Sequence, residues 1–166
     1  MSTAPVVAFI GRSGAGKTTL LEKVVRELTA RGRRVATVKH HSHRGFEIDR
    51  EGKDSWRMAR AGSRHVVVAA PDKVAAYRTL ERELGLAEIV AGIDDVDIVL
   101  VEGYRDSDVP HVEVVRGTPG FVGSPERRVA VVTDLALDVD VPVFDLDDVA
   151  GVVGFLEAML PLQPHA

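Results

Sequence analysis

Residues Gly11 to Thr18 read Gly-Arg-Ser-Gly-Ala-Gly-Lys-Thr and match the pattern G-x-x-x-x-G-K-[ST] without a gap. Glycines in such a segment let the backbone wrap closely around a ligand. Consecutive main-chain N–H groups then form a concave nest that binds anions. A helix that begins near Lys17 would direct the positive end of its dipole at the same place. The pattern therefore predicts a loop that holds a polyphosphate, a P-loop.

The side chains at the end of this loop have distinct predicted roles. The Lys17 ammonium is expected to reach the β- and γ-phosphates and to act as the catalytic charge. The Thr18 hydroxyl is expected to ligate Mg²⁺, and Thr19 to approach the α-phosphate. The nucleotide-contacting residues predicted in the loop are Gly11, Ser13, Gly14, Ala15, Gly16, Lys17, Thr18 and Thr19.

A P-loop needs a second oxygen ligand for the metal or its water shell, and Glu102 is the candidate. It ends the apolar run Ile98-Val99-Leu100-Val101, which is typical of a buried strand. Asp97 begins the same run and is therefore expected at the opposite edge of the sheet, away from phosphate. The predicted metal ligands are Thr18 and Glu102.

A polar segment, residues 39–49, follows the next predicted strand and begins at the sheet edge where open α/β sheets bind ligands. Lys39 and His40 are predicted to contact the nucleotide, and Asp49 to position a metal or the attacking water as a catalytic residue. The three histidines His40, His41 and His43 leave a second interpretation open, a transition-metal site. A merely solvated loop is the third.

Base selectivity is assigned to Asp134, which follows an apolar run in Val131-Val132-Thr133-Asp134. A carboxylate accepts hydrogen bonds from both N1–H and the exocyclic amine of guanine, a pair of donors that adenine lacks. An ordinary turn aspartate is the alternative interpretation. The ligand is accordingly expected to be GTP with Mg²⁺.

Hydrophobic periodicity predicts alternating strands and helices, and hence a three-layer α/β P-loop NTPase domain with a mostly parallel sheet, a single domain over residues 1–166. The segment 65–70 is expected to be a buried strand, 111–115 a more exposed one, and Asp147 to cap the last helix. The expected strands are 6–10, 34–38, 65–70, 74–78, 97–101, 111–115, 128–132 and 141–144, and the expected helices 17–31, 54–61, 80–93 and 149–160.

Composition narrows the classes of function. The chain has 166 residues, of which 45% are hydrophobic. It has no cysteine, and this absence excludes disulfides, thiolate zinc sites and cysteine nucleophiles. A net charge of −4 argues against a broad nucleic-acid surface. No signal peptide and no apolar run of membrane-spanning length is visible. A cytoplasmic protein with no nucleic-acid or membrane partner is expected.

Several segments together resemble the molybdopterin-guanine dinucleotide biosynthesis protein B (MobB) family. The P-loop alone is unspecific, and the combination of the later segments is much more specific. The segments that carry the resemblance are Gly11 to Thr18, Val38-Lys39-His40 with Phe46-Glu47-Ile48-Asp49, Gly52-Lys53-Asp54-Ser55-Trp56, Ala61-Gly62, Val101-Glu102-Gly103-Tyr104, Pro110-His111-Val112-Glu113-Val114 and Val132-Thr133-Asp134. Tyr104-Arg105 and His111 depart from the Phe-Lys and Lys expected there.

The resemblance implies a P-loop GTPase-like fold, GTP binding with weak hydrolysis, and a homodimer whose sheets extend across the subunit contact. It implies an accessory role beside the guanylyltransferase that attaches GMP to molybdopterin, with that enzyme and molybdopterin itself as partners. It places phosphate at Gly14, Gly16, Lys17, Thr18 and Thr19, and Mg²⁺ near Glu102. Two alternatives from the residues stay open: a small-molecule kinase, and a metal-insertion adaptor switched by nucleotide.

Overall fold

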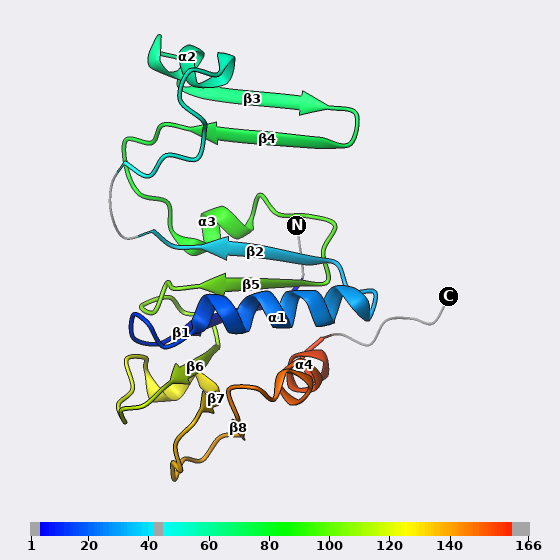
Figure 1. Ribbon diagram of the computed structural model, residues 1–166, viewed down its shortest axis with the longest axis vertical. Coiled ribbons are helices and arrows are strands. Elements are labelled where there is room, and N and C mark those ends of the chain that lie inside the picture. The colour runs from blue at the N-terminus through cyan, green and yellow to red at the C-terminus, as the bar shows by residue number, and fades with distance from the viewer. Residues whose placement is uncertain (1–3, 42–44, 161–166) are drawn as a thin grey trace. The chain divides into compact units, whose positions relative to one another are not determined.

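The structure is a computed structural model that describes residues 4–41 and 45–160 (Figure 1). Its contacts divide the chain into two compact units, Met1–His40 with Leu86–Ala166, and His41–Gly85. The P-loop lies in the first unit. Whether the two units act as the single nucleotide-binding domain expected over residues 1–166 stays a prediction.

The first unit is built on a six-stranded sheet in which every neighbouring pair of strands is parallel. The strand that leads into the P-loop, β1 (Val6–Ile10), lies between β5 (Ile98–Glu102) and β6 (His111–Val115). Parallel neighbours need crossover connections. Among the described residues, α-helices stand in the connection from β1 to β2 (Val35–Lys39) and in the one from β2 to β5, and the other three connections contain none. In spatial order the strands are β2 (Val35–Lys39), β5 (Ile98–Glu102), β1 (Val6–Ile10), β6 (His111–Val115), β7 (Arg128–Thr133) and β8 (Val143–Phe144).

One face of this sheet is covered by α1 (Lys17–Ala30) and α4 (Val149–Ala158). Alternate strand residues such as Phe9 and Leu100 point to this face and pack with Val24 of α1 and Leu156 of α4, all fully buried. The intervening residues face the other side, where Leu86 of α3 (Leu86–Val90) packs over β1 and β5. Strands buried on both faces read as continuous apolar runs, which is why the sequence shows them so clearly.

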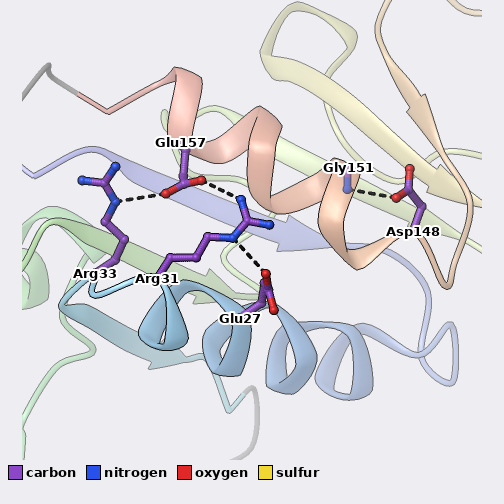
Figure 2. Close-up of polar contacts among 6 residues, drawn as sticks. All are labelled: Glu27, Arg31, Arg33, Asp148, Gly151 and Glu157. Atoms are coloured by element: carbon purple, nitrogen blue, oxygen red, sulfur yellow. Dashed lines mark hydrogen bonds and ion pairs between the residues drawn. The ribbon is translucent and has the colours of Figure 1, made fainter.

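Polar contacts link α4 to residues at and just after the end of α1 (Figure 2). The Glu157 carboxylate accepts hydrogen bonds from Arg31 at 2.8 Å and Arg33 at 3.1 Å. The Arg31 guanidinium, followed by that of Arg33, lowers the pKa of Glu157. Asp148 caps α4 by accepting the Gly151 N–H at 2.9 Å. The expectation that Asp147 caps this helix is wrong by one residue.

The second unit contains α2 (Asp54–Arg60) and an antiparallel hairpin, β3 (His65–Ala70) with β4 (Lys73–Arg78). The Tyr77 hydroxyl donates to Asp49 at 2.7 Å and lies 3.2 Å from the Ser55 carbonyl oxygen. These contacts hold one face of the hairpin against the start of α2. The other face presents Val67 and Val74, which are 57% and 68% exposed.

Three sequence-based expectations are corrected by the structure. Strand β6 is buried along its whole length, because it lies between β1 and β7. Strand β3 is mostly exposed, because β4 is its ladder partner in a sheet of two strands. The helix expected over 80–93 shortens to α3, since Gly85 precedes it and Leu80 is 45% exposed. Within the described ranges, none of the helices is long and apolar enough to span a bilayer.

Candidate functional site

The P-loop connects β1 to α1 and has the backbone that a phosphate nest requires. Gly11, Gly14 and Gly16 all have positive φ, at 147°, 78° and 93°. At Gly11 a Cβ would lie 2.3 Å from the Val114 carbonyl oxygen. The loop therefore begins in direct contact with the neighbouring strand β6, and only glycine permits that approach.

Lys17 lies at the first position of α1 and folds over the loop. Its Nζ donates to the carbonyl oxygens of Gly11 at 2.9 Å and Arg12 at 2.8 Å. Burial lowers the pKa of Lys17, while Glu102 opposes this shift and Lys39 adds to it. The ammonium is thus positioned by main-chain acceptors at the mouth of the loop, where phosphate oxygens can replace those acceptors.

Thr18 and Glu102 come together although they are far apart in the sequence. The Thr18 Oγ1 lies 2.9 Å from both carboxylate oxygens of Glu102. Lys39 Nζ lies 3.3 Å from the same carboxylate. This contact arises because β2, β5 and β1 are parallel neighbours whose carboxyl ends meet at one edge. A hydroxyl and a carboxylate oxygen are ligands that Mg²⁺ accepts, so these donors fit the predicted ion.

His40 follows β2 and lies beside the turn after β5. Its ring stacks on Tyr104 with centroids 4.4 Å apart, and its backbone N–H donates to the Glu102 carbonyl oxygen at 2.9 Å. Asp97 accepts from Arg34 at the other end of the sheet, in agreement with its predicted place. Ser13, Ala15 and Thr19 belong to the P-loop and the first turn of α1, as expected.

Two predicted site residues make contacts that give them structural roles. Asp134 follows β7 and accepts the Gly117 N–H at 2.8 Å. Asp49 lies in the second unit, where the hydrogen bond from Tyr77 is the main cause that lowers the pKa of Asp49 and raises the pKa of Tyr77 to about 12. Base reading by Asp134 and catalysis by Asp49 stay predictions.

The metal-site interpretation of the histidine segment stays a prediction. Among the described residues, no three His, Cys, Asp or Glu side chains are grouped closely enough to hold a metal ion. His43 and Arg44 lie outside the described residues. His41 lies near Phe46, with ring centroids 5.7 Å apart.

A buried charged cluster under the β6–β7 connection was not singled out from the sequence. Glu113, fully buried, accepts from the backbone N–H groups of Val122 and Gly123 and from Arg128 at 2.9 Å. His111 lies 3.9 Å from the same carboxylate. Burial is the main cause that lowers the pKa of His111. A charged residue inside the apolar run His-Val-Glu-Val-Val was the signal that could have revealed this cluster.

Known proteins resemble this chain over most of its length. The family model of molybdopterin guanine dinucleotide synthesis protein B, MobB, matches residues 6–134. A molybdopterin-guanine dinucleotide biosynthesis adapter protein of Haemophilus influenzae is 36% identical, covering 94% of this chain and 89% of that protein. The adapter protein of Escherichia coli is 35% identical, covering 96% and 95%.

Solved structures give the same result for the fold. The crystal structure of a molybdopterin-guanine biosynthesis protein B superposes with a TM-score of 0.73 at 30% identity, covering 93% of this chain and 99% of that one. Bacillus subtilis MobB superposes with a TM-score of 0.77 at 22% identity, covering 96% and 99%, and supports the fold alone. The mostly parallel α/β fold predicted from the sequence is confirmed, and the chain belongs to the MobB family.

Proposed function

We propose that the chain is a cytoplasmic, GTP-binding adapter that assists the attachment of GMP to molybdopterin. The observation that carries the nucleotide part is the P-loop with Thr18 Oγ1 set 2.9 Å from both Glu102 oxygens, a ready pair of oxygen ligands for Mg²⁺. The biosynthetic part is supported by relatives that are named adapter proteins of this synthesis and are covered over most of their length.

Phosphate binding would rest on main-chain N–H groups of the P-loop and on Lys17. In the structure the Lys17 ammonium donates hydrogen bonds to the carbonyl oxygens of Gly11 and Arg12. In the nucleotide complex it would donate to the β- and γ-phosphates instead. Mg²⁺ would be held by Thr18, with Glu102 as a direct ligand or as acceptor for its water shell, and it would neutralise charge that develops on the phosphates. Lys39, paired with Glu102, adds positive charge at the same edge.

We propose that Asp134 recognises the guanine base, and its place at the carboxyl end of β7 supports this role. The hydrogen bond from the Gly117 N–H orients its carboxylate. A carboxylate can accept hydrogen bonds from both N1–H and the exocyclic amine of guanine. The family description also names a dinucleotide that contains guanine.

Hydrolysis is proposed to be slow, by in-line attack of water on the γ-phosphate. Asp49 is the proposed residue that positions the water. Its pKa is lowered, first by the hydrogen bond from Tyr77, so that it is ionised at neutral pH. The sequence shows no clear arginine finger, and Arg12 and Arg44 are the candidates for one that acts across a dimer.

The proposed partners are the molybdopterin guanylyltransferase, molybdopterin and a second copy of this chain. The hairpin supports the homodimer. One face of the ladder carries the apolar side chains of Val67, Ala69, Val74 and Ala76. The two valines on this face are more than half exposed. A two-stranded ribbon with an apolar face is marginal in water unless something covers it.

The decisive experiment compares binding of GTP, ATP, GDP and ADP to the purified chain, with and without Mg²⁺. Wild-type protein should prefer the guanine nucleotides and need Mg²⁺ for full affinity. Lys17→Ala should abolish binding without changing the circular dichroism spectrum. Glu102→Gln should weaken the dependence on Mg²⁺. A folded wild-type chain that binds no nucleoside triphosphate would contradict the proposal.

The assignment of Asp134 is tested separately. Asp134→Asn should weaken GTP binding by about tenfold, equivalent to about 1.4 kcal/mol, and leave ATP binding nearly unchanged. An equal loss for both nucleotides would show that Asp134 braces the Gly117 loop and does not read the base.

A further inference from the structure

A cavity of about 230 Å³ lies between the P-loop and the carboxyl end of β6. Residues 12–15 form one wall, and residues from 114 to 120 form the other. Its polar side chains are those of Arg12, Ser13, Arg116 and Thr118, and no carboxylate lines it. Both charged groups that line the cavity are therefore positive.

These two arginines differ from the other arginines of the first unit. Within residues 4–41 and 45–160, neither the Arg12 nor the Arg116 guanidinium has a hydrogen-bond or ion-pair partner. Each of the other arginines of this unit pairs with a carboxylate. Those arginines are Arg26, Arg31, Arg33, Arg34, Arg105, Arg127 and Arg128. Both guanidiniums are exposed, line one cavity and have no carboxylate partner among the described residues, so the cavity suits an anionic ligand.

The segment that carries Arg116 is held in place from both ends. Its Gly117 N–H donates to Asp134 at 2.8 Å, and the buried Glu113 accepts from Val122 and Gly123. Arg116 Nη1 lies 3.7 Å from the position of a Cβ on Gly16, so it borders the P-loop.

On the opposite wall, Arg12 is packed against the same connection. Its Nη2 lies 2.6 Å from the position of a Cβ on Gly120, so that a side chain there would displace the guanidinium. Both arginines therefore adjoin the cavity from anchored backbone, and binding would have to order only their side chains.

We propose that Arg12, Arg116 and Thr118 form a second phosphate subsite beside the P-loop. Guanidinium forks match phosphate oxygens in two-point hydrogen bonds, and the hydroxyl adds a further donor. The site takes a phosphate group either from the end of the bound nucleotide or from a phosphate monoester on a second ligand. The first source rests on the proposed nucleotide function, whereas the second stands without it.

The test titrates inorganic phosphate into the full-length chain and follows backbone amide shifts of Arg116, Thr118 and Gly120. One sample is saturated with GDP and Mg²⁺, and the other with the non-hydrolysable guanosine 5′-(β,γ-imido)triphosphate and Mg²⁺. Binding to both samples supports a second ligand as the source. Binding only to the GDP sample supports the terminal phosphate of the nucleotide.

Variants assign the effect to the arginines. Arg116→Ala and Arg12→Ala should each weaken phosphate binding to the GDP sample by about tenfold or more. Arg116→Lys should recover part of it, because charge returns without the fork. Arg26→Ala removes a paired, exposed arginine of α1 and is the control, with phosphate affinity unchanged.

Two results would overturn the subsite: no saturable phosphate shift in either wild-type sample, or unchanged binding in both alanine variants. If the wild-type chain binds no nucleotide, the proposed function fails and phosphate is titrated into the nucleotide-free chain. Binding lost in Arg116→Ala but kept in Lys17→Ala then upholds the subsite, and the reverse pattern refutes it.

Discussion

Lys17 is the cation at the end of the P-loop, and its side chain is partly buried. Burial lowers the pKa of Lys17 in the free protein, and its two hydrogen bonds go to neutral carbonyl oxygens. Bound phosphate would replace these acceptors with anions and raise that pKa again. Nucleotide binding is therefore coupled to the protonation of this one group.

The sign of this coupling gives a prediction. Below the free-state pKa of Lys17 the ammonium is charged in both states, and affinity does not depend on its titration. As pH rises through that lowered pKa, binding must take up a proton and the affinity for GDP should fall. Titration calorimetry at a series of pH values measures this slope.

Lys17→Arg is the control for the pH series, because arginine stays charged throughout. The ligand titrates in the same way in both series. Subtracting one pH profile of affinity from the other therefore leaves only the contribution of Lys17. Parallel pH profiles for wild type and Lys17→Arg would show that Lys17 does not titrate in the binding reaction.

Gly11 and Gly14 should respond differently to alanine although both have positive φ. A Cβ on Gly11 would overlap the Val114 carbonyl oxygen at 2.3 Å, whereas nothing lies within 4 Å of one on Gly14. Gly11→Ala should lower the free energy of unfolding by at least about 3 kcal/mol, from strain plus overlap. Gly14→Ala should cost about 1–2 kcal/mol from backbone strain alone. Urea denaturation compares them, and equal costs would contradict the proposed contact with β6.

At the scale of elements, the connection from β6 to β7, residues 116–127, contains no α-helix. Between the strands stand a loop and the short 3₁₀ turn η1 (Pro125–Arg127). Glu113 supplies acceptors for two backbone N–H groups of this loop. Arg128 pairs with that carboxylate and stacks on Phe121, 3.6 Å from the ring centroid. One buried carboxylate thus fixes the wall of the cavity beside the P-loop.

Removing that carboxylate should be costly. Glu113→Ala leaves Arg128 and two N–H groups without their acceptor in the interior, and should lower the free energy of unfolding by about 3–5 kcal/mol. The double variant Glu113→Leu with Arg128→Met, in which neither charge remains, should recover part of this loss. Glu22→Ala on the exposed side of α1 is the control and should change stability by less than about 0.5 kcal/mol. A loss below about 1 kcal/mol for Glu113→Ala would refute the assigned role.

At the scale of the whole molecule, the prediction concerns the exposed hairpin face that carries Val67 and Val74. We expect a second copy of the chain to cover this face. Replacing both valines by lysine puts charge on this face without changing the ladder. If a second copy covers the face, sedimentation equilibrium should show a dimer for wild type and a monomer for the double variant. Lys73→Gln, on the same hairpin, is the control and should stay dimeric. A monomeric wild type at micromolar concentration would contradict the homodimer.

The sequence predicted the P-loop well because its chemistry is local. Gly11, Gly16 and Lys17 lie within seven consecutive positions between a buried strand and an amphipathic helix, and short-range geometry alone brings their amides together. The apolar runs predicted the parallel sheet for the same reason, since a strand buried on both faces has a recognisable composition. Errors arose where burial depends on neighbours. Strand β6 alternates like an exposed strand yet is buried, and β3 reads as buried yet is mostly exposed.

Only the tertiary structure decided which distant residues share the site. Thr18 meets Glu102 across 84 positions because β5 is placed next to β1, and no local pattern encodes strand order. Strand order likewise brings Arg116 to the P-loop, because β6 lies on the other side of β1. It also brings Asp134, which follows β7, to the Gly117 N–H that follows β6. Local sequence thus determined the phosphate-binding loop, while the order of parallel strands determined what surrounds it.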